Sequence, residues 1–276
     1  MSALSAQPPT AVDGIRVGIG GWTYAPWRDN FYPRGLVQRR ELEYASRHVS
    51  AIEINGTYYG TQKPASYAKW RDEVPEGFVF SAKAPRRIMQ SRVLAKTGPQ
   101  VDAFIGGIAE LGAALGPLLW QFDAGPRIDR DDFAAFLELL PASAGKLRLR
   151  HVLDVRAPDF VDAAYLALAR RHGMATVFTD SPEHPSFADV TADFVYARLM
   201  RTRSAIATGY PPAELRRWAQ RARTWAGGGE PSDLPRIEPE GTAEAKPRDV
   251  FVYFISGSKE RNPGAAMALL HLLGAT

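Results

Sequence analysis

Residues 50–83, "SAIEINGTYYGTQKPASYAKWRDEVPEGFVFSAK", contain a strand, a helix and a second strand in succession. Residues 50–55 and 78–83 are short runs rich in strand-forming residues, whereas residues 64–74 have the spacing of a helix. A helix between two such strands is typical of parallel strands joined by a crossover connection. The segment therefore predicts an α/β fold.

The same alternation continues along most of the chain. The predicted strands are 15–22, 50–55, 78–83, 118–122, 147–156, 175–180, 193–199 and 249–256. The predicted helices are 39–49, 64–74, 101–115, 130–140, 160–173, 212–226 and 264–274. Eight strands with helices between nearly all of them predict a TIM-type (β/α) barrel of parallel strands, with a doubly wound sheet as the alternative.

The ends and one insertion stand apart from this pattern. Residues 1–13 are predicted to be a disordered lead, and residues 14–276 a single barrel domain. Residues 227–248 are rich in Gly, Pro and charge, so we expect a flexible surface insertion between a helix and the next strand. In a barrel such a loop lies on the face opposite the chemistry.

No segment of the sequence indicates contact with a membrane. The N-terminal "MSALSAQPPTAVDG" has no basic region followed by an apolar core, so a signal peptide is not expected. The longest apolar stretch, residues 111–122, is too short to cross a bilayer. These features predict a cytoplasmic protein without a membrane partner.

Charge leaves nucleic acid as a possible partner. The net charge is +4, the isoelectric point is about 9.3, and 27 of the 34 basic residues are Arg. The densest basic region comprises Arg201, Arg203, Arg216, Arg217, Arg221 and Arg223. A nucleic-acid-binding or nucleic-acid-processing barrel is therefore one alternative function, although a net charge this small is a weak argument for it.

Candidate site residues lie where the predicted strands end. In a barrel of this type the carboxyl ends of the strands and the loops after them build the active site. The unusual polar and aromatic residues there are Trp22, Tyr24, Glu53, Asn55, Tyr58, Lys83, Arg86, Gln121, Asp154, Arg156, Asp180, Arg198 and Tyr253. Because buried charge is costly unless paired, we expect Glu53 to face a cation such as Lys83 or Arg156.

These residues suggest a pocket for a small anionic ligand. Lys83, Arg156 and Arg198 would hold a phosphate or carboxylate group. Glu53 or Asp154 would act as general acid or base in a hydrolase or isomerase of phosphorylated or sugar-like compounds. Trp22, Tyr24 and Tyr58 would wall the pocket.

The sequence indicates neither a metal nor a cofactor. There is no cysteine, and no two of the five histidines have the spacing of metal ligands. The stretch "GIGG" at 18–21 lacks the third glycine of a dinucleotide fingerprint and the lysine of a phosphate-binding loop. We therefore expect a metal-independent protein without a cofactor.

Several motifs resemble the YecE-like family, also known as domain of unknown function 72. They include "GIGGWTYAPWRDNFYP", "IEINGTYYGTQKPASYAKWRDEVPEGFVFSAKAPRRI", "RHVLDVRAPDF" and "DFVYARL", and the resemblance extends from Val17 to the end of the chain. It implies a TIM-type barrel but no established reaction. The matching positions include all of the candidate site residues given above, with Asp154 standing where the family usually has Glu.

The sequence also departs from the family pattern. Where the family usually has Thr-His, Arg-His-Pro and Arg-Leu-His-Gly, this chain has Met89-Gln90, Arg156-Ala157-Pro158 and Arg198-Leu199-Met200-Arg201. The family's Tyr-Phe-Asn-Asn-Asp is replaced by "YFISG" at 253–257. These losses favour a second alternative, a non-catalytic barrel that acts as a scaffold or sensor.

Overall fold

Eight parallel strands form a closed barrel in the computed structural model, which describes residues 9, 11–125, 128–238 and 244–275. The strands are β1 (Ile15–Gly20), β2 (Ala51–Ile54), β3 (Val79–Lys83), β4 (Leu115–Phe122), β7 (His151–Val155), β8 (Ala175–Thr179), β9 (Phe194–Leu199) and β10 (Asp249–Phe254). They are hydrogen-bonded in the order in which they occur along the chain, and β10 closes the barrel on β1. The TIM-type barrel is confirmed, and the doubly wound sheet is wrong.

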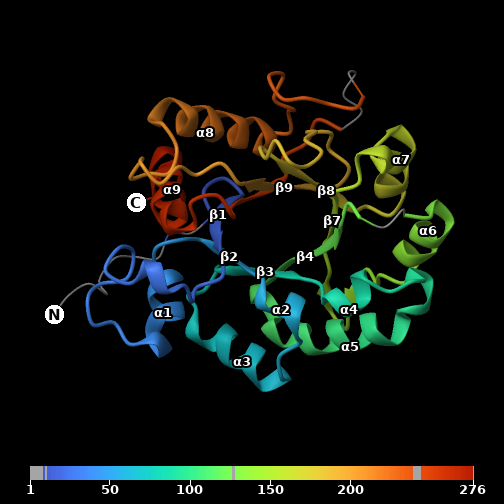
Figure 1. The fold of residues 1–276 in the computed structure, drawn as a ribbon, viewed down its shortest axis with the longest axis horizontal. Coiled ribbons are helices and arrows are strands. Elements are labelled where there is room, and N and C mark those ends of the chain that lie inside the picture. Colours follow the sequence, from blue (N-terminus) through green and yellow to red (C-terminus); the bar gives the residue numbers. More distant parts are fainter. Residues whose placement is uncertain (1–8, 10, 126–127, 239–243, 276) are drawn as a thin grey trace.

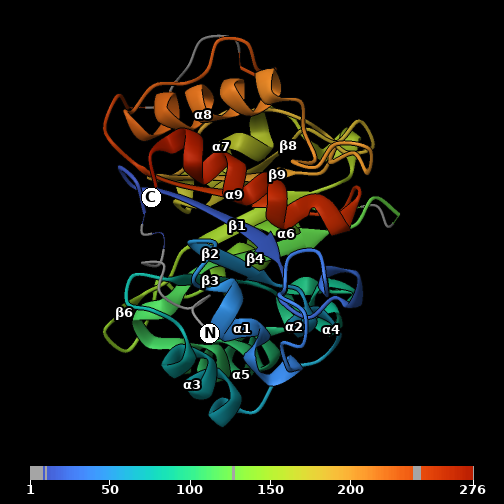
Figure 2. The same cartoon turned by 90° about the vertical axis from the view of Figure 1, so that its left-hand side faces the viewer.

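Helices surround the strands (Figure 1; Figure 2 gives the view from the side). The α-helices are α1 (Glu41–Ala45), α2 (Gly56–Tyr59), α3 (Pro64–Glu73), α4 (Arg86–Met89), α5 (Gly98–Ile108), α6 (Arg130–Glu138), α7 (Ala163–Arg171), α8 (Pro212–Ala226) and α9 (Asn262–Leu273). The short 3-10 helices are η1 (Ala25–Trp27), η2 (Gln38–Arg40), η3 (Leu94–Lys96), η4 (Ala109–Ala114), η5 (Pro158–Phe160) and η6 (Lys259–Arg261). No helix in the described part of the chain is both long and apolar enough to span a membrane.

Strand β2 shows how the sequence specifies the two faces of the barrel wall. Side chains alternate along a strand, so Ile52 and Ile54 pack outward in the large core between strands and helices. Ala51 points to the second core, inside the barrel, where it joins Tyr196 and Tyr253. Glu53 lies on the same inward face and is fully buried, which places a carboxylate inside the barrel.

Three predicted elements differ from the structure. The strand predicted over 147–156 is divided into β6 (Leu147–Arg148), which pairs antiparallel with β5 (Ser143–Ala144), and the barrel strand β7. The helix predicted over 101–115 ends as η4, where Gly112 has a positive φ of 53° that no helix continues through. Only residues 41–45 of the segment 39–49 are α-helical, preceded by η2.

Two glycines of β1 make room inside the barrel. A Cβ atom on Gly18 would lie 2.2 Å from the carbonyl oxygen of Ala51 and 2.9 Å from the ring of Tyr253. A Cβ atom on Gly20 would lie 2.8 Å from Ile255 Cδ1. Because β1 has no inward side chain at these positions, residues of the neighbouring strands can meet across it.

Parts of the two unusual segments can be described. Most of the lead expected at 1–13, and residues 239–243 of the insertion expected at 227–248, lie outside the described residues. The backbone nitrogens of Ile237 and Glu238 donate to the carboxylate of Asp189, at 2.8 and 3.0 Å. Ala188 N donates to the carbonyl oxygen of Pro235. This part of the insertion therefore packs on the connection between β8 and β9, which contains no helix.

Candidate functional site

An ion triad lies inside the C-terminal end of the barrel. Arg198 on β9 donates to both oxygens of Glu53 on β2, from Nε at 3.1 Å and from Nη2 at 3.0 Å. Its Nη1 donates to Asp154 Oδ2 on β7 at 2.9 Å. The side chains of Arg198 and Glu53 are 3% and 0% exposed, so each charge is compensated within the protein, as buried charge requires.

Hydroxyl groups support the triad from below. Tyr196 OH donates to Glu53 Oε2 at 2.7 Å and lies 2.8 Å from Ser81 Oγ. The ring of Tyr253 packs against that of Tyr196 at a centroid distance of 5.0 Å. Both oxygens of Glu53 are thus fixed by Arg198 and Tyr196, and Glu53 is held beneath the mouth of the barrel rather than at its surface.

Arg156 and Lys83 lie above the triad, at the mouth. Arg156 follows β7 and donates to Asp154 Oδ2 from Nε at 3.3 Å and from Nη2 at 3.2 Å. Its side chain is 18% exposed, and its Nη1 has no acceptor among the described residues. The Nζ atom of Lys83, the last residue of β3, lies 3.9 Å from the ring centroid of Tyr58.

The prediction that Glu53 faces a cation is confirmed, but its direct partner is Arg198, not Lys83 or Arg156.

The environment of Lys83 disfavours its charged form. Burial and the positive charge of Arg198 lower the pKa of the Lys83 amine to about 8, although Glu53 acts in the opposite direction. Within the described residues the amine has neither a hydrogen bond nor an ion pair. Lys83 therefore brings a partly neutral, unpaired amine to the mouth near neutral pH.

The loop after β4 adds a carboxylate to the mouth. Asp123 accepts a hydrogen bond from Gln121 Nε2 at 2.7 Å and a longer one from Tyr58 OH at 3.4 Å. Burial and Asp123 raise the pKa of Tyr58, so its phenol stays protonated. Gln121 Oε1 is buried without a partner among the described residues. Arg86, at the start of α4, is exposed nearby, and its charge acts on Tyr58.

The structure does not bring all candidate residues to the mouth. Trp22 packs outside the barrel, at 4.8 Å from Trp70 and 6.0 Å from Phe80, because it follows the outward turn at Gly21. It therefore cannot wall the pocket as expected. Tyr253 is fully buried inside the barrel below the triad, so a ligand at the mouth does not reach it.

Three further candidates have local roles. Asp180 accepts from Met200 N and from Tyr210 OH, each at 2.6 Å, and burial raises the pKa of its carboxyl. Asn55 precedes α2, and its Nδ2 donates to the carbonyl oxygen of Glu53 at 3.4 Å. Tyr24 lies under the amine of Lys259 at 4.7 Å, beside the β1 end of the barrel.

The sequence analysis missed three residues of this region. They are Asp123, His184 and Lys259. Asp123 directly follows a predicted strand and could have been found by the rule that selected the others. His184 lies in a strand-to-strand loop without a local signal, yet it is close enough to Arg156 for that charge, together with burial, to lower the pKa of its imidazole.

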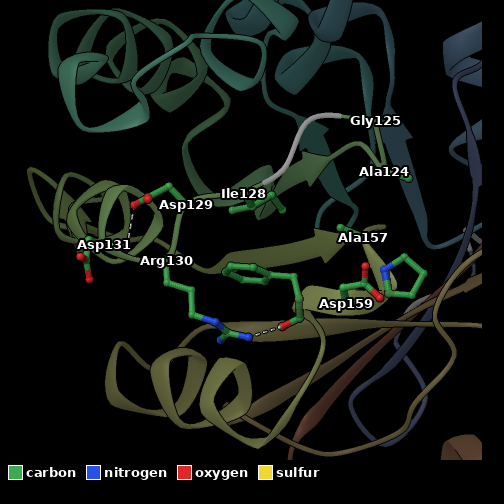
Figure 3. A pocket seen from close by; sticks show the side chains of 10 residues that line it. Ala124, Gly125, Ile128, Asp129, Arg130, Asp131, Ala157 and Asp159 are labelled. Carbon is green, nitrogen blue, oxygen red and sulfur yellow. Dashed lines mark hydrogen bonds between the residues drawn. The ribbon is translucent and has the colours of Figure 1, made fainter.

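A surface groove adjoins the mouth between the connections that follow β4 and β7. It is lined by Ala124, Gly125, Ile128, Asp129, Arg130, Asp131, Ala157, Pro158, Asp159 and Phe160. Figure 3 shows Arg130 reaching toward the carbonyl oxygen of Phe160, a distance of 3.4 Å. Asp129 caps α6 through the backbone nitrogen of Asp131. Arg130 therefore links the two connections that form the groove.

No group of three or more His, Asp or Glu side chains in the described ranges is arranged to hold a metal ion. The three acids of the mouth are engaged by other side chains instead. Glu53 and Asp154 share Arg198, and Asp123 contacts Gln121 and Tyr58. The mouth thus presents arginine and lysine nitrogens rather than a cluster of oxygen ligands.

The fold and the site define a parallel eight-stranded barrel with a buried ion triad beneath its C-terminal mouth. The chain matches the family model described as "Protein of unknown function DUF72" over residues 16–276, and it belongs to that family. This confirms the family resemblance found in the sequence.

Solved structures of the family share the fold. A DUF72 family protein of Enterococcus faecalis superposes with a TM-score of 0.68 and 17% identity, over 95% of this chain and 96% of that one. A DUF72 family protein of Thermotoga maritima gives a TM-score of 0.69 and 17% identity, over 94% and 97%. A curated relative, the UPF0759 protein YunF of Bacillus subtilis (strain 168), is 31% identical over 70 residues, 25% of this chain and only 24% of that protein.

Proposed function

We propose that the mouth of the barrel binds a small molecule with a phosphate or carboxylate group, and that Arg156 makes the main charged contact. The proposal rests on a difference in hydrogen bonding and exposure between two arginines, Arg198 and Arg156. All three donor nitrogens of Arg198 that face the triad are engaged, and the residue is 2% exposed. Arg156 is more exposed and keeps Nη1 without an acceptor among the described residues. Guanidinium groups suit planar and tetrahedral anions because they donate in a fixed fork.

The neighbours of Arg156 favour a polar ligand. The Lys83 amine faces the same mouth without an ion pair in the described part of the chain, and Arg86 is exposed at its rim. Asp154 shares only Oδ2 with the two arginines. Its second oxygen has no donor among the described residues and is available as a general base. These positions fit a metal-independent isomerase or hydrolase, and we propose a cytoplasmic location for this activity.

Two alternatives receive less support. The basic helix α8 uses part of its charge internally, since Arg221 pairs with Asp233 at 2.7 Å and Arg223 donates to Leu272 O at 2.8 Å. This makes a phosphate backbone a less favoured partner. A purely structural barrel would not need an unpaired lysine with a lowered pKa at its mouth, since such groups mark functional sites more often than structural ones.

A matched pair of variants tests the proposal. Arg150 and Arg156 flank the two ends of β7, and Arg150 pairs with Asp249 at the opposite end of the barrel. Calorimetric titration with inorganic phosphate, pyruvate and a set of sugar phosphates would be carried out on the native protein, Arg156→Met and Arg150→Met. We expect at least one anion to bind the native protein and Arg150→Met, with at least about tenfold weaker binding to Arg156→Met. Equal binding to all three proteins, or no binding at all, would refute the assignment.

A further inference from the structure

The geometry around Lys83 points to covalent carbonyl chemistry: we propose that its amine forms an imine with an aldehyde or ketone that carries an anionic group. This inference rests on the proposed anion site and names the substrate class. It starts from the position of the amine, which lies over the Tyr58 ring at 3.9 Å and has neither a hydrogen bond nor an ion pair within the described residues. A lysine that serves only to balance charge would be expected to contact one of the nearby carboxylates.

The carboxylates near Lys83 are already paired with arginine. Both oxygens of Glu53 accept from Arg198, and Asp154 Oδ2 accepts from Arg156 and Arg198. The ion triad therefore neutralises its own acids and leaves the amine exposed to repulsion from two guanidinium groups. Burial and these charges favour the neutral amine, which is how enzymes make lysine nucleophilic.

The mouth also offers a partner for the rest of such a substrate. With its anionic group on Arg156 Nη1, a short keto acid or a phosphorylated ketose would have its carbonyl group among the residues of the mouth. Arg156 is close enough to Lys83 for its charge to lower the pKa of the amine. Arg156 thus selects the anion and Lys83 captures the carbonyl carbon.

The chemical step balances with the amine, the carbonyl compound and one proton from solvent. The lone pair of the neutral amine forms a C–N bond to the carbonyl carbon, and the carbonyl oxygen takes up the proton that the nitrogen gives up. A second proton converts the resulting hydroxyl to water, which leaves as the nitrogen lone pair forms the C=N bond of a cationic imine. That proton comes from solvent at the mouth, because burial and Asp123 raise the pKa of Tyr58 and make its phenol a poor acid. Water is the only product released, and its addition reverses the step.

An imine of this kind would give Asp154 a role as the general base that removes a proton from the adjacent carbon. The positive nitrogen withdraws electrons from the adjacent carbon and makes its C–H bond more acidic. The free oxygen of Asp154 lies on the same mouth, as its charge acts on Lys83. A lysine and a carboxylate in these positions suit isomerisation or cleavage next to a carbonyl group.

Borohydride trapping tests the proposal directly. The full-length protein would be incubated at pH 8 with pyruvate, dihydroxyacetone phosphate or neutral dihydroxyacetone, and then reduced with sodium cyanoborohydride. Intact mass and peptide mapping would follow for the native protein and for Lys83→Arg, which keeps the charge but cannot form the same adduct. Lys69→Arg is the control, because Lys69 is 69% exposed and pairs with Glu73.

The expected result is one adduct per chain on Lys83, with the mass of the carbonyl compound less one oxygen atom. It should form in the native protein and in Lys69→Arg, disappear in Lys83→Arg and fall at least tenfold in Arg156→Met for the anionic compounds only. Adducts spread over the exposed lysines, with none favoured, would overturn the proposal.

The two proposals fail in distinguishable ways. If calorimetry shows anion binding that depends on Arg156 but Lys83 is never trapped, the imine is refuted and the anion site stands. If Lys83 is trapped by neutral dihydroxyacetone as readily as by the anionic compounds, the imine stands and the role of Arg156 is refuted. The absence of both anion binding and Lys83 trapping would refute both proposals.

Discussion

Glu53 and Arg198, separated by 145 residues along the chain, form an ion pair with two hydrogen bonds inside the barrel. They belong to β2 and β9, which are separated in the barrel by β1 and β10. On β1, which lies between β2 and β10, Gly18 and Gly20 carry no side chain, and a Cβ atom at Gly18 would lie within 3 Å of Ala51 and Tyr253. A pair of this kind connects opposite parts of the barrel and fixes the groups above it.

The first prediction concerns the buried carboxylate. Glu53→Gln should lower the free energy of unfolding by about 3–5 kcal/mol, because Arg198 loses a fully buried counter-charge. Glu43→Gln, which breaks a surface pair with Arg40, should cost less than about 1 kcal/mol. Urea denaturation of both variants measures the difference, and similar losses in the two would contradict a buried triad.

The second prediction separates charge from geometry. Arg198→Lys keeps the positive charge but cannot donate to Glu53 from two nitrogens and to Asp154 from a third. We expect a loss of at least about 2 kcal/mol in unfolding free energy. A variant as stable as the native protein would mean that a point charge suffices, and that the hydrogen-bond geometry adds nothing.

The third prediction concerns the unfolding free energy that the protein loses by burying the charge of Lys83. The folded protein holds the Lys83 proton more weakly than the unfolded chain, with a pKa of about 8 against 10.5. Stability should therefore rise with pH between about 8 and 10.5, since the unfolded state binds more protons there. Lys83→Met should be more stable than the native protein at pH 7 by about 1–2 kcal/mol.

The control for this prediction is the pH dependence of the stability difference between Lys83→Met and the native protein. The advantage of Lys83→Met should shrink as the pH rises from 8 toward 10.5, because the folded protein then holds a neutral lysine and no longer buries its charge. Denaturation curves at pH 7 and pH 10 for the two proteins decide the matter. An advantage that is independent of pH would mean that packing, not charge burial, is responsible.

The fourth prediction concerns Asp180. Burial raises the pKa of its carboxyl above that of the unfolded chain. Its contribution to stability is therefore greatest at acidic pH and is lost as the pH rises through the folded pKa. Asp180→Asn should flatten the pH dependence of unfolding just above the ordinary carboxyl range, because Asn remains neutral and can still accept from Met200 N. An unchanged pH profile would count against a protonated Asp180 in the folded state.

The fifth prediction concerns the space inside the barrel. Gly18→Ala should destabilise by about 3 kcal/mol or more, since its Cβ would lie 2.2 Å from a carbonyl oxygen of β2 that has no freedom to move. Gly106→Ala on the exposed face of α5 meets nothing within 4 Å and should stabilise by about 0.5–1 kcal/mol. Thermal melting of the two variants checks the contrast.

The sequence predicted the barrel well because its strand-length runs alternate with helical segments. All eight barrel strands coincide with predicted ones, and the bounds of α8 match the predicted 212–226. The short β5–β6 ladder and the end of α5 were missed, since they depend on a turn and on one glycine conformation rather than on periodicity.

The site was only partly predictable. Alternation along single strands correctly placed Glu53, Asp154 and Arg198 on inward faces, but it could not pair residues on different strands. The sequence therefore treated Arg198 and Arg156 alike, whereas the structure buries one in a triad and leaves the other at the mouth. Trp22 was misplaced because Gly21 turns the chain outward, and no strand periodicity applies beyond that point.

The most direct test of the account is the pKa of the Lys83 amine, measured by NMR of isotope-labelled lysine side chains. The chain has only seven lysines, and Lys83→Arg assigns the signal. The account predicts a pKa of about 8 in the free protein, rising when an anion binds beside Arg156. An ordinary lysine pKa near 10.5 that no anion changes would contradict both the anion site and the reactive amine.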